Sequence, residues 1–202
     1  MLPAARTSRT LLRFVLVCAV CLPGLTAPAR ASKVRPMDLE EMTERAGRII
    51  SGRCLRVRAV EESGIGLPAT EVTFQVDRTL KGKAGDLLTI RQPASLPGAG
   101  EARILGLPRF RPGEEVILFL YGESASGLTS PVGLGQGKFT VFTDKAGRRW
   151  AVNGHGNRNL SRGRAAEAGG PAAEAHPGIA ADLLLERVRT LLRPEPGDRG
   201  AP

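Results

Sequence analysis

The sequence predicts a mainly β protein, a small antiparallel β-barrel with a short helix before it and an amphipathic helix after it. Six segments between residues 48 and 152 show the alternation or the apolar density of strands, and glycine- or proline-containing turns separate most of them. Two other segments, 39–46 and 178–193, carry apolar residues at helical spacing instead. Short strands at such spacing are typical of a meander or a small barrel.

The chain of 202 residues begins with a segment typical of a secretory signal. Three arginines precede a short apolar run at 14–22, and Ala29-Arg30-Ala31 has the small residues of a cleavage site. We expect residues 1–31 to be removed near Ala31–Ser32, so that the mature chain is periplasmic or secreted. Four arginines and no acids leave with the signal, so the 171 remaining residues carry a net charge of +5 instead of +9.

The mature chain is expected to contain one folded domain and two extensions. Residues 32–153 would form the β-barrel domain with its leading helix. Residues 154–177 are rich in glycine, alanine and arginine without an apolar period, which favours a flexible linker. Helix 178–193 follows, and 194–202 is a disordered tail. After removal of the signal, no segment is long and apolar enough to span a membrane.

The leading helix is predicted over 39–46, with Asp38 as its N-cap and Glu41 three residues further on. The first strand follows at 48–61. Its apolar phase slips near Gly52–Cys54, which predicts a bulge or a bend there.

The central strands are predicted from residue 70 onward. Residues 70–90 alternate on both sides of a glycine-containing turn, as a hairpin does. Residues 116–121 are apolar on both faces, which predicts a central strand buried on both sides. A glycine-interrupted strand is expected at 132–143, and a return strand at 148–152.

No residue constellation indicates catalysis, a cofactor or a metal. Cys54 is the one cysteine left after removal of the signal, so the mature chain cannot form an intrachain disulfide. We interpret Cys54 as a buried small apolar residue. His155 and His176 lack the spaced carboxylates or cysteines of a metal site. Residues 133–138 contain glycines and a lysine but match neither the phosphate-loop nor the dinucleotide pattern. Glu114 and Glu115 would point to opposite faces of a strand, so they form no acid/base pair.

Basic residues gather at the end of the predicted barrel, namely Arg148, Arg149, Arg158, Arg162 and Arg164. Among the aromatic residues only Trp150 lies close, whereas proteins that bind single-stranded nucleic acid provide several stacking platforms. We therefore expect no nucleic acid partner. A solvated surface is the simplest interpretation, and another exported protein or an anionic cell-envelope component is the expected partner if the surface binds one.

The order of these elements resembles a family of bacterial exported proteins with an OB barrel like that of netrin and the tissue inhibitors of metalloproteinases. The resemblance covers about residues 38–153 and is carried by IISGRCLRVRAV, TEVTFQVDRTLKG, PGEEVILFL and GLGQGKF. It implies an OB-like barrel. The eukaryotic inhibitors use an N-terminal cysteine and several disulfides, which the mature chain lacks, so their mechanism does not carry over.

The predicted function is that of an exported, non-catalytic binding or interaction module. OB barrels bind through loops and one sheet face, so loops 92–103, 122–130 and 153–157 are the expected contact surfaces. The residues expected to make contacts are Arg109, Gln136, Lys138, Trp150, Asn153 and His155. Two alternatives stay open: an accessory protein or inhibitor of an exported protease, and a hydrolase with a site built from scattered loops.

Overall fold

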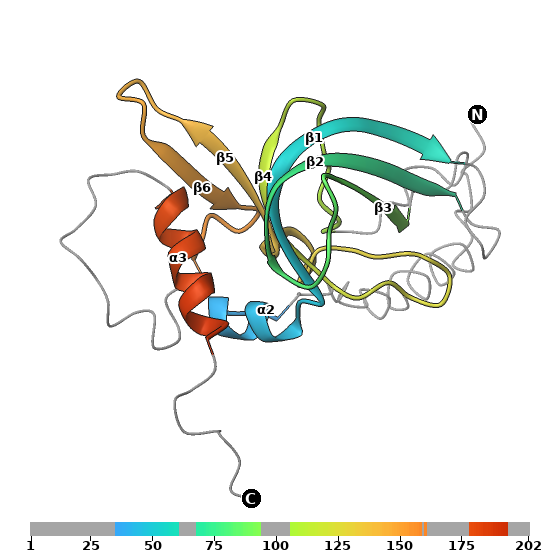
Figure 1. The fold of residues 1–202 in the computed structure, drawn as a ribbon, viewed down its shortest axis with the longest axis horizontal. Coiled ribbons are helices and arrows are strands. Elements are labelled where there is room, and N and C mark those ends of the chain that lie inside the picture. The colour runs from blue at the N-terminus through green and yellow to red at the C-terminus, as the bar shows by residue number, and fades with distance from the viewer. Residues whose placement is uncertain (1–34, 61–67, 94–105, 159, 161–177, 194–202) are drawn as a thin grey trace, which may run out of the picture. The chain divides into compact units, whose positions relative to one another are not determined.

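The computed structural model describes residues 35–60, 68–93, 106–158, 160 and 178–193, all of which belong to one compact unit, Val34–Pro202. Within these residues the protein is mainly β. Seven antiparallel strands form one sheet in the order β3-β2-β1-β4-β5-β6-β7 (Figure 1). The predicted signal at 1–31 and the tail at 194–202 lie outside the described residues.

Helix α2 (Leu39–Arg45) begins and ends at residues that satisfy its free backbone groups. The carboxylate of Asp38 accepts a hydrogen bond from the Glu41 N–H at 2.8 Å, which confirms the predicted N-cap. At the other end, Lys81 Nζ donates to the carbonyls of Thr43 and Glu44. A cation at this end also complements the helix dipole.

Strand β1 (Arg48–Val60) is the element on which the sheet is built, because it pairs with both β2 (Ala69–Lys81) and β4 (Glu115–Leu120). Its pairing with β2 shifts register between Ile49 and Ile50, between Ser51 and Gly52, and between Cys54 and Arg56. These shifts confirm the predicted irregularity near Gly52–Cys54. Register shifts of this kind bend a strand and increase its twist.

The predicted hairpin is confirmed by the pairing of β2 with β3 (Leu87–Pro93). Val72 lies opposite Ile90, and Phe74 lies opposite Leu88. These four side chains enter a core between strands β1 to β4, the inner core, which also contains Ile50, Cys54, Phe110, Val116, Leu118 and Leu120.

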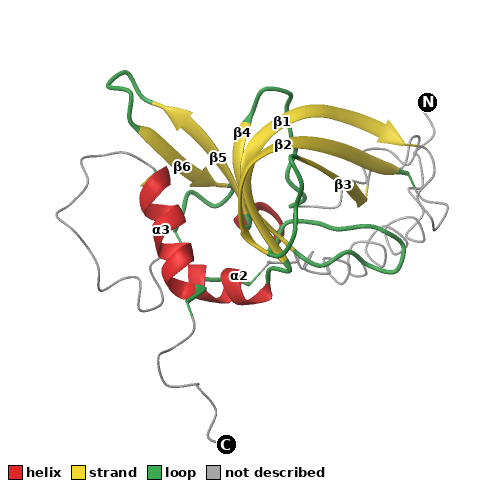
Figure 2. Ribbon diagram, viewed as in Figure 1, coloured by secondary structure: helices red, strands yellow, loops and turns green. Residues whose placement is uncertain are grey.

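Strand β4 is buried on both faces, as its sequence predicts. Val116, Leu118 and Leu120 enter the inner core, whereas Ile117 and Phe119 enter a second core on the other face. Helices α2 and α3 (Ala181–Leu191) cover this helix-side core and contact each other (Figure 2). Leu184, Leu185 and Val188 of α3 are buried there, so this helix docks on its own domain. Among the described residues, no helix is long and apolar enough to cross a membrane.

The expected barrel is not closed. The first and last strands of the sheet, β3 and β7 (Ile179–Ala180), do not pair with each other. The loop 122–130 instead reaches from the end of β4 to β3, where the Thr129 N–H donates to the Arg91 carbonyl at 2.8 Å. A closed barrel needs a row of backbone hydrogen bonds between its first and last strands. Within the described residues, β3 and β7 form no such row.

The strand expected at 132–143 is also shorter than predicted. Gly133 and Leu134 have positive φ angles and begin a 3₁₀ turn, η1 (Leu134–Gln136), before β5 (Lys138–Thr143) starts. The turn brings Gly137 against the backbone of Val132, where a Cβ atom would lie 2.5 Å from the Val132 carbonyl oxygen. The glycines of this segment therefore permit a close backbone approach, as their pattern predicts.

The end of the domain also differs from the prediction. Strand β6 (Arg149–Asn153) pairs with β5 and with β7, a two-residue strand that precedes α3 and has no recognisable alternation. Residues 154–158, at the start of the expected linker, form a turn, and Leu160 is buried in the helix-side core. The rest of the expected linker, 161–177, lies outside the described residues.

Candidate binding site

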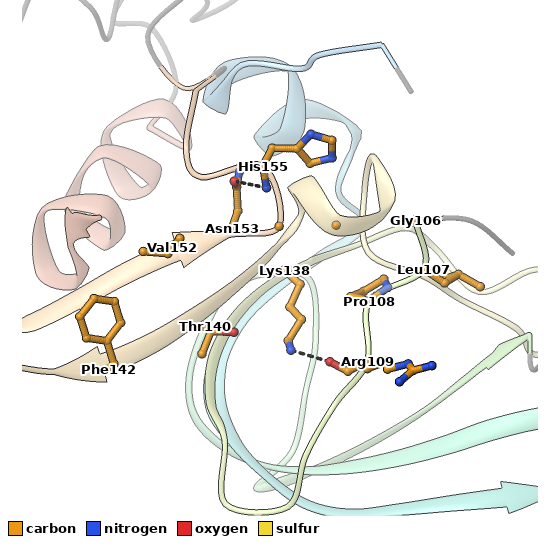
Figure 3. A pocket seen from close by; sticks show the side chains of 12 residues that line it. Gly106, Leu107, Pro108, Arg109, Lys138, Thr140, Phe142, Val152, Asn153 and His155 are labelled. Carbon is orange, nitrogen blue, oxygen red and sulfur yellow. Dashed lines mark hydrogen bonds between the residues drawn. The ribbon is translucent and has the colours of Figure 1, made fainter. Parts of the chain in front are cut away.

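A cavity of about 640 Å³ lies between the loop 106–109, strands β5 and β6, and the turn after β6 (Figure 3). Its walls come from three separate parts of the chain. The lining residues are Gly106, Leu107, Pro108, Arg109, Gly135, Lys138, Thr140, Phe142, Val152, Asn153, Gly154 and His155.

The loop wall is held by polar side chains beneath it. Lys138 Nζ donates to the Arg109 carbonyl at 2.6 Å, and Gln92 Nε2 donates to the Pro108 carbonyl at 3.1 Å. The next residue, Phe110, is buried in the inner core, where its ring meets that of Phe74 edge to face at 5.2 Å. These contacts leave the loop backbone fixed while the Arg109 side chain is exposed.

Lys138 is buried and paired. Its ammonium group lies 2.6 Å from Glu114 Oε1, which also accepts from Thr140 Oγ1 at 2.8 Å. The ammonium also lies 4.9 Å from the centroid of the Phe110 ring. The charge of Lys138 is thus balanced inside the wall, because a buried ion needs a partner.

The turn after β6 is ordered by two asparagines. Asn153 Oδ1 accepts from the N–H groups of His155 and Asn157, and Asn157 Oδ1 accepts from the Asn153 N–H. The Gly154 N–H donates to the Gly135 carbonyl at 2.8 Å, an approach that leaves no room for a side chain at Gly154. The exposed His155 side chain is therefore carried by a rigid turn at the rim of the cavity.

Apolar side chains contribute most of the remaining wall. Phe142 and Val152 point from β5 and β6 to the same face as Thr140, since strand residues two apart share a face. Phe142 is 37% exposed, which is a large exposure for a phenylalanine. The cavity therefore has an apolar surface, and the Arg109 guanidinium and the His155 imidazole lie at its edge.

The structure brings four of the six expected contact residues to this cavity: Arg109, Lys138, Asn153 and His155. Gln136 lies beneath the surface, fully buried, and its side chain binds the Met37 N–H and the Arg35 carbonyl. Trp150 lies further along β6 and is not a lining residue.

Sequence reasoning missed Leu107, Pro108, Thr140, Phe142 and Val152 as lining residues. The alternation of β5 and β6 carried a signal for the last three, since it places them on one face. Of the expected contact loops, 94–103 lies outside the described residues, and 122–130 packs on β3 through Thr129.

The cysteine and the two adjacent glutamates that the sequence singled out have structural roles. Burial raises the pKa of the Cys54 thiol, and the nearby Glu114 carboxylate adds to the effect, so the thiol is protonated at neutral pH. Glu115 pairs with Arg149, and Glu114 with Lys138, so the two acids have separate partners. No group of three or more His, Cys, Asp or Glu side chains that could hold a metal occurs within the described ranges.

Two of the three described arginines of the predicted basic cluster are paired, and the third, Arg158, is exposed. Arg148 binds Asp144 at 2.9 Å, and Arg149 binds Glu115 and lies 3.8 Å from Asp182. Arg162 and Arg164 lie outside the described residues. The described part of this cluster is therefore less available to an anionic partner than its sequence suggests.

No family model, curated protein or solved structure matches this chain. The resemblance to exported OB-barrel proteins therefore stays a prediction.

Proposed function

We propose that the protein is an exported, non-catalytic binding module whose contact site is the cavity between residues 106–109 and strands β5 and β6. The observation that carries the proposal is the convergence of Arg109, Lys138, Asn153 and His155 on one cavity. Its volume falls within the range of about 300–1,000 Å³ that is usual for ligand sites.

The state of the polar groups supports binding over catalysis. Lys138 and Asn153 hold the walls, and the Thr140 hydroxyl donates to Glu114, which also binds Lys138. The described lining residues include no carboxylate, serine or cysteine. General acid–base or nucleophilic catalysis needs a titrating group with a partner in hydrogen-bond reach of the substrate. Within the described residues, the His155 imidazole makes no hydrogen bond or ion pair, and the hydrogen bond of this residue is made by its backbone N–H.

The lining also indicates the chemistry of the ligand. Phe142, Val152, Leu107 and Pro108 offer an apolar surface. The Arg109 guanidinium makes no ion pair in the described part of the chain and lies at the edge of the cavity, where it points away from Phe142 and Val152 (Figure 3). An apolar group that carries a carboxylate fits both. In an exported protein, a peptide segment of another exported protein provides such a group.

The test is an NMR titration of the isotopically labelled chain with a library of short peptides and small carboxylates. We expect ligands to shift the amide signals of 106–109 and 138–155. Arg109→Ala should weaken the binding of these ligands roughly tenfold, because a hydrogen bond to a charged group contributes about 1.5–3 kcal/mol. Leu183→Ala, an exposed position on α3, is the matched control and should change nothing.

Two results would contradict the proposal. Ligands that shift only signals remote from the cavity would place the site elsewhere. Turnover in a broad panel of hydrolase substrates, lost in His155→Ala, would favour the hydrolase alternative. Inhibition of an exported protease that Arg109→Ala abolishes would keep the cavity and assign it to the inhibitor alternative.

A further inference from the structure

A different surface, the solvent face of strands β1, β2 and β3, carries several arginines and two exposed leucines. Three arginines of β1 lie on this face because of the register shift between Cys54 and Arg56. Leu55 is the extra residue there, so Cys54 and Val57 both face the inner core. Arg53, Arg56 and Arg58 therefore point outward, and Arg91 of β3 joins them two strands away. We call these four residues the arginine face.

The arginine face has a positive charge that is held in place. Arg58 and Arg91 both bind the carboxylate of Glu71 on the strand between them, at 2.8 and 3.3 Å. Burial alone would raise the pKa of Glu71, but these two bonds outweigh it and lower the pKa, so the group is anionic at neutral pH. Arg56 makes no ion pair in the described part of the chain. The four arginines and Glu71 together carry a net charge of +3.

Two exposed leucines lie among these arginines. Leu55 is 44% exposed, and Leu87, opposite Gln75 at the start of β3, is 62% exposed. Leu87 is the most exposed large apolar side chain in the described ranges. The two leucines lie on strands separated only by β2, so about 10 Å apart across the sheet. The fold therefore leaves a large part of each leucine side chain in contact with solvent.

Cations beside exposed leucines match the interface of an anionic membrane. Guanidinium groups bind lipid phosphates in bidentate fashion, and leucine side chains enter the boundary between head groups and acyl chains. A soluble polyanion would use the arginines and gain nothing from the leucines. The leucines therefore favour a lipid surface over an anionic polymer.

We propose that the arginine face, together with Leu55 and Leu87, docks the protein on the surface of a membrane containing anionic lipid. This face is separate from the cavity on β5 and β6. The two proposals can therefore be tested independently: the cavity can bind its ligand when membrane docking is lost, and the protein can dock on a membrane when ligand binding is lost.

The test is co-sedimentation of the purified chain with vesicles of phosphatidylcholine, with and without phosphatidylglycerol. All variants are compared in the same processed form. We expect binding only to the mixed vesicles. Arg56→Gln should weaken it about fivefold, the contribution usual for one basic residue near an anionic surface. Leu87→Ser should weaken it several-fold at low and high salt alike, whereas salt should screen the Arg56 effect.

The matched controls are Leu183, which is 46% exposed on α3, and Arg193, which is exposed just after the end of this helix. Leu183→Ser and Arg193→Gln should leave vesicle binding unchanged. Losses in these controls equal to those at Leu87 and Arg56 would overturn the assignment to this face. The proposal also fails if wild type ignores the mixed vesicles, or if dextran sulfate binds equally well and Leu87→Ser changes nothing. If thermal melting shows that Leu87→Ser is unfolded, Leu55→Ser tests the contribution of the exposed leucines instead.

Discussion

At the scale of single residues, Asp144 shows how one carboxylate organises a hairpin tip. It accepts hydrogen bonds from Trp150 Nε1 and from the N–H groups of Ala146 and Arg148, and the Arg148 side chain also binds it. The hydrogen bond from Trp150 lowers the pKa of Asp144 most, burial opposes the change, and the bonds from Arg148 and Ala146 lower it further. The pKa therefore lies well below the usual range for an aspartate.

This arrangement predicts a specific pH dependence. Because the folded-state pKa is lowered, the stabilisation by ionised Asp144 is complete above the ordinary aspartate pKa and is lost as the pH falls through the lowered value. Trp150 is the one tryptophan of the chain, so its fluorescence reports the event. We expect a fluorescence transition in the folded protein well below pH 3.8. Asp144→Asn should lack it; an unchanged transition in that variant would contradict the assignment.

Residue types alone indicated the polar character of the site but not the role of each side chain. Gln136 and Lys138 have similar sequence surroundings, and both were expected to make contacts. In the structure Gln136 is fully buried and binds backbone around Arg35, about a hundred residues away in sequence, whereas Lys138 reaches the cavity wall. Partners so distant in the chain leave no local signal.

At the scale of elements, Gly52 lies where the backbone of β2 leaves no room for a side chain on β1. A Cβ atom at this position would lie 2.1 Å from the Gln75 carbonyl oxygen. The register shift between Ser51 and Gly52 lies at the same point. The pairing of β1 with β2 at this register shift therefore depends on the absence of a side chain at Gly52.

Substitution at this glycine should be costly. We expect Gly52→Ala to lower the free energy of unfolding by roughly 3 kcal/mol or more, because the obstacle is backbone that cannot move aside easily. Gly85→Ala is the matched control. Its Cβ would meet nothing closer than 3.9 Å, and the change should stay within about 1 kcal/mol. Urea unfolding of the two variants measures both values, and equal losses would refute the role of Gly52.

The elements themselves were largely predictable, for reasons visible in particular segments. Strands β1 to β4 carry long apolar alternations or a doubly apolar run, and α2 carries its N-cap in the sequence. Strand β7 has two residues, too few for a period, and the turn at Leu134–Gln136 depends on positive φ angles that the spacing of glycines does not fix.

At the scale of the whole molecule, export is a prediction from the first 31 residues and stays one. We expect the chain, produced with its full N-terminus in a bacterial host, to be recovered outside the cytoplasm with Ser32 as its first residue. Mass spectrometry of the intact protein checks this directly. Replacing the apolar run at 14–22 by polar residues is the control and should abolish processing. A full-length product in the cytoplasm would contradict export.

By itself the sequence determined the fold class, the doubly buried strand β4, the capped helix α2 and the irregularity of β1. These features follow from periodicity and from residues near one another in the chain. Only the tertiary structure decided that the sheet stays open, with Thr129 binding β3 in place of a closing strand. It also decided that residues 106–109, β5 and β6 form one cavity, and that arginines and leucines share a solvent face. Each of these depends on pairing and register between distant segments, which a one-residue slip would change and which no local pattern records.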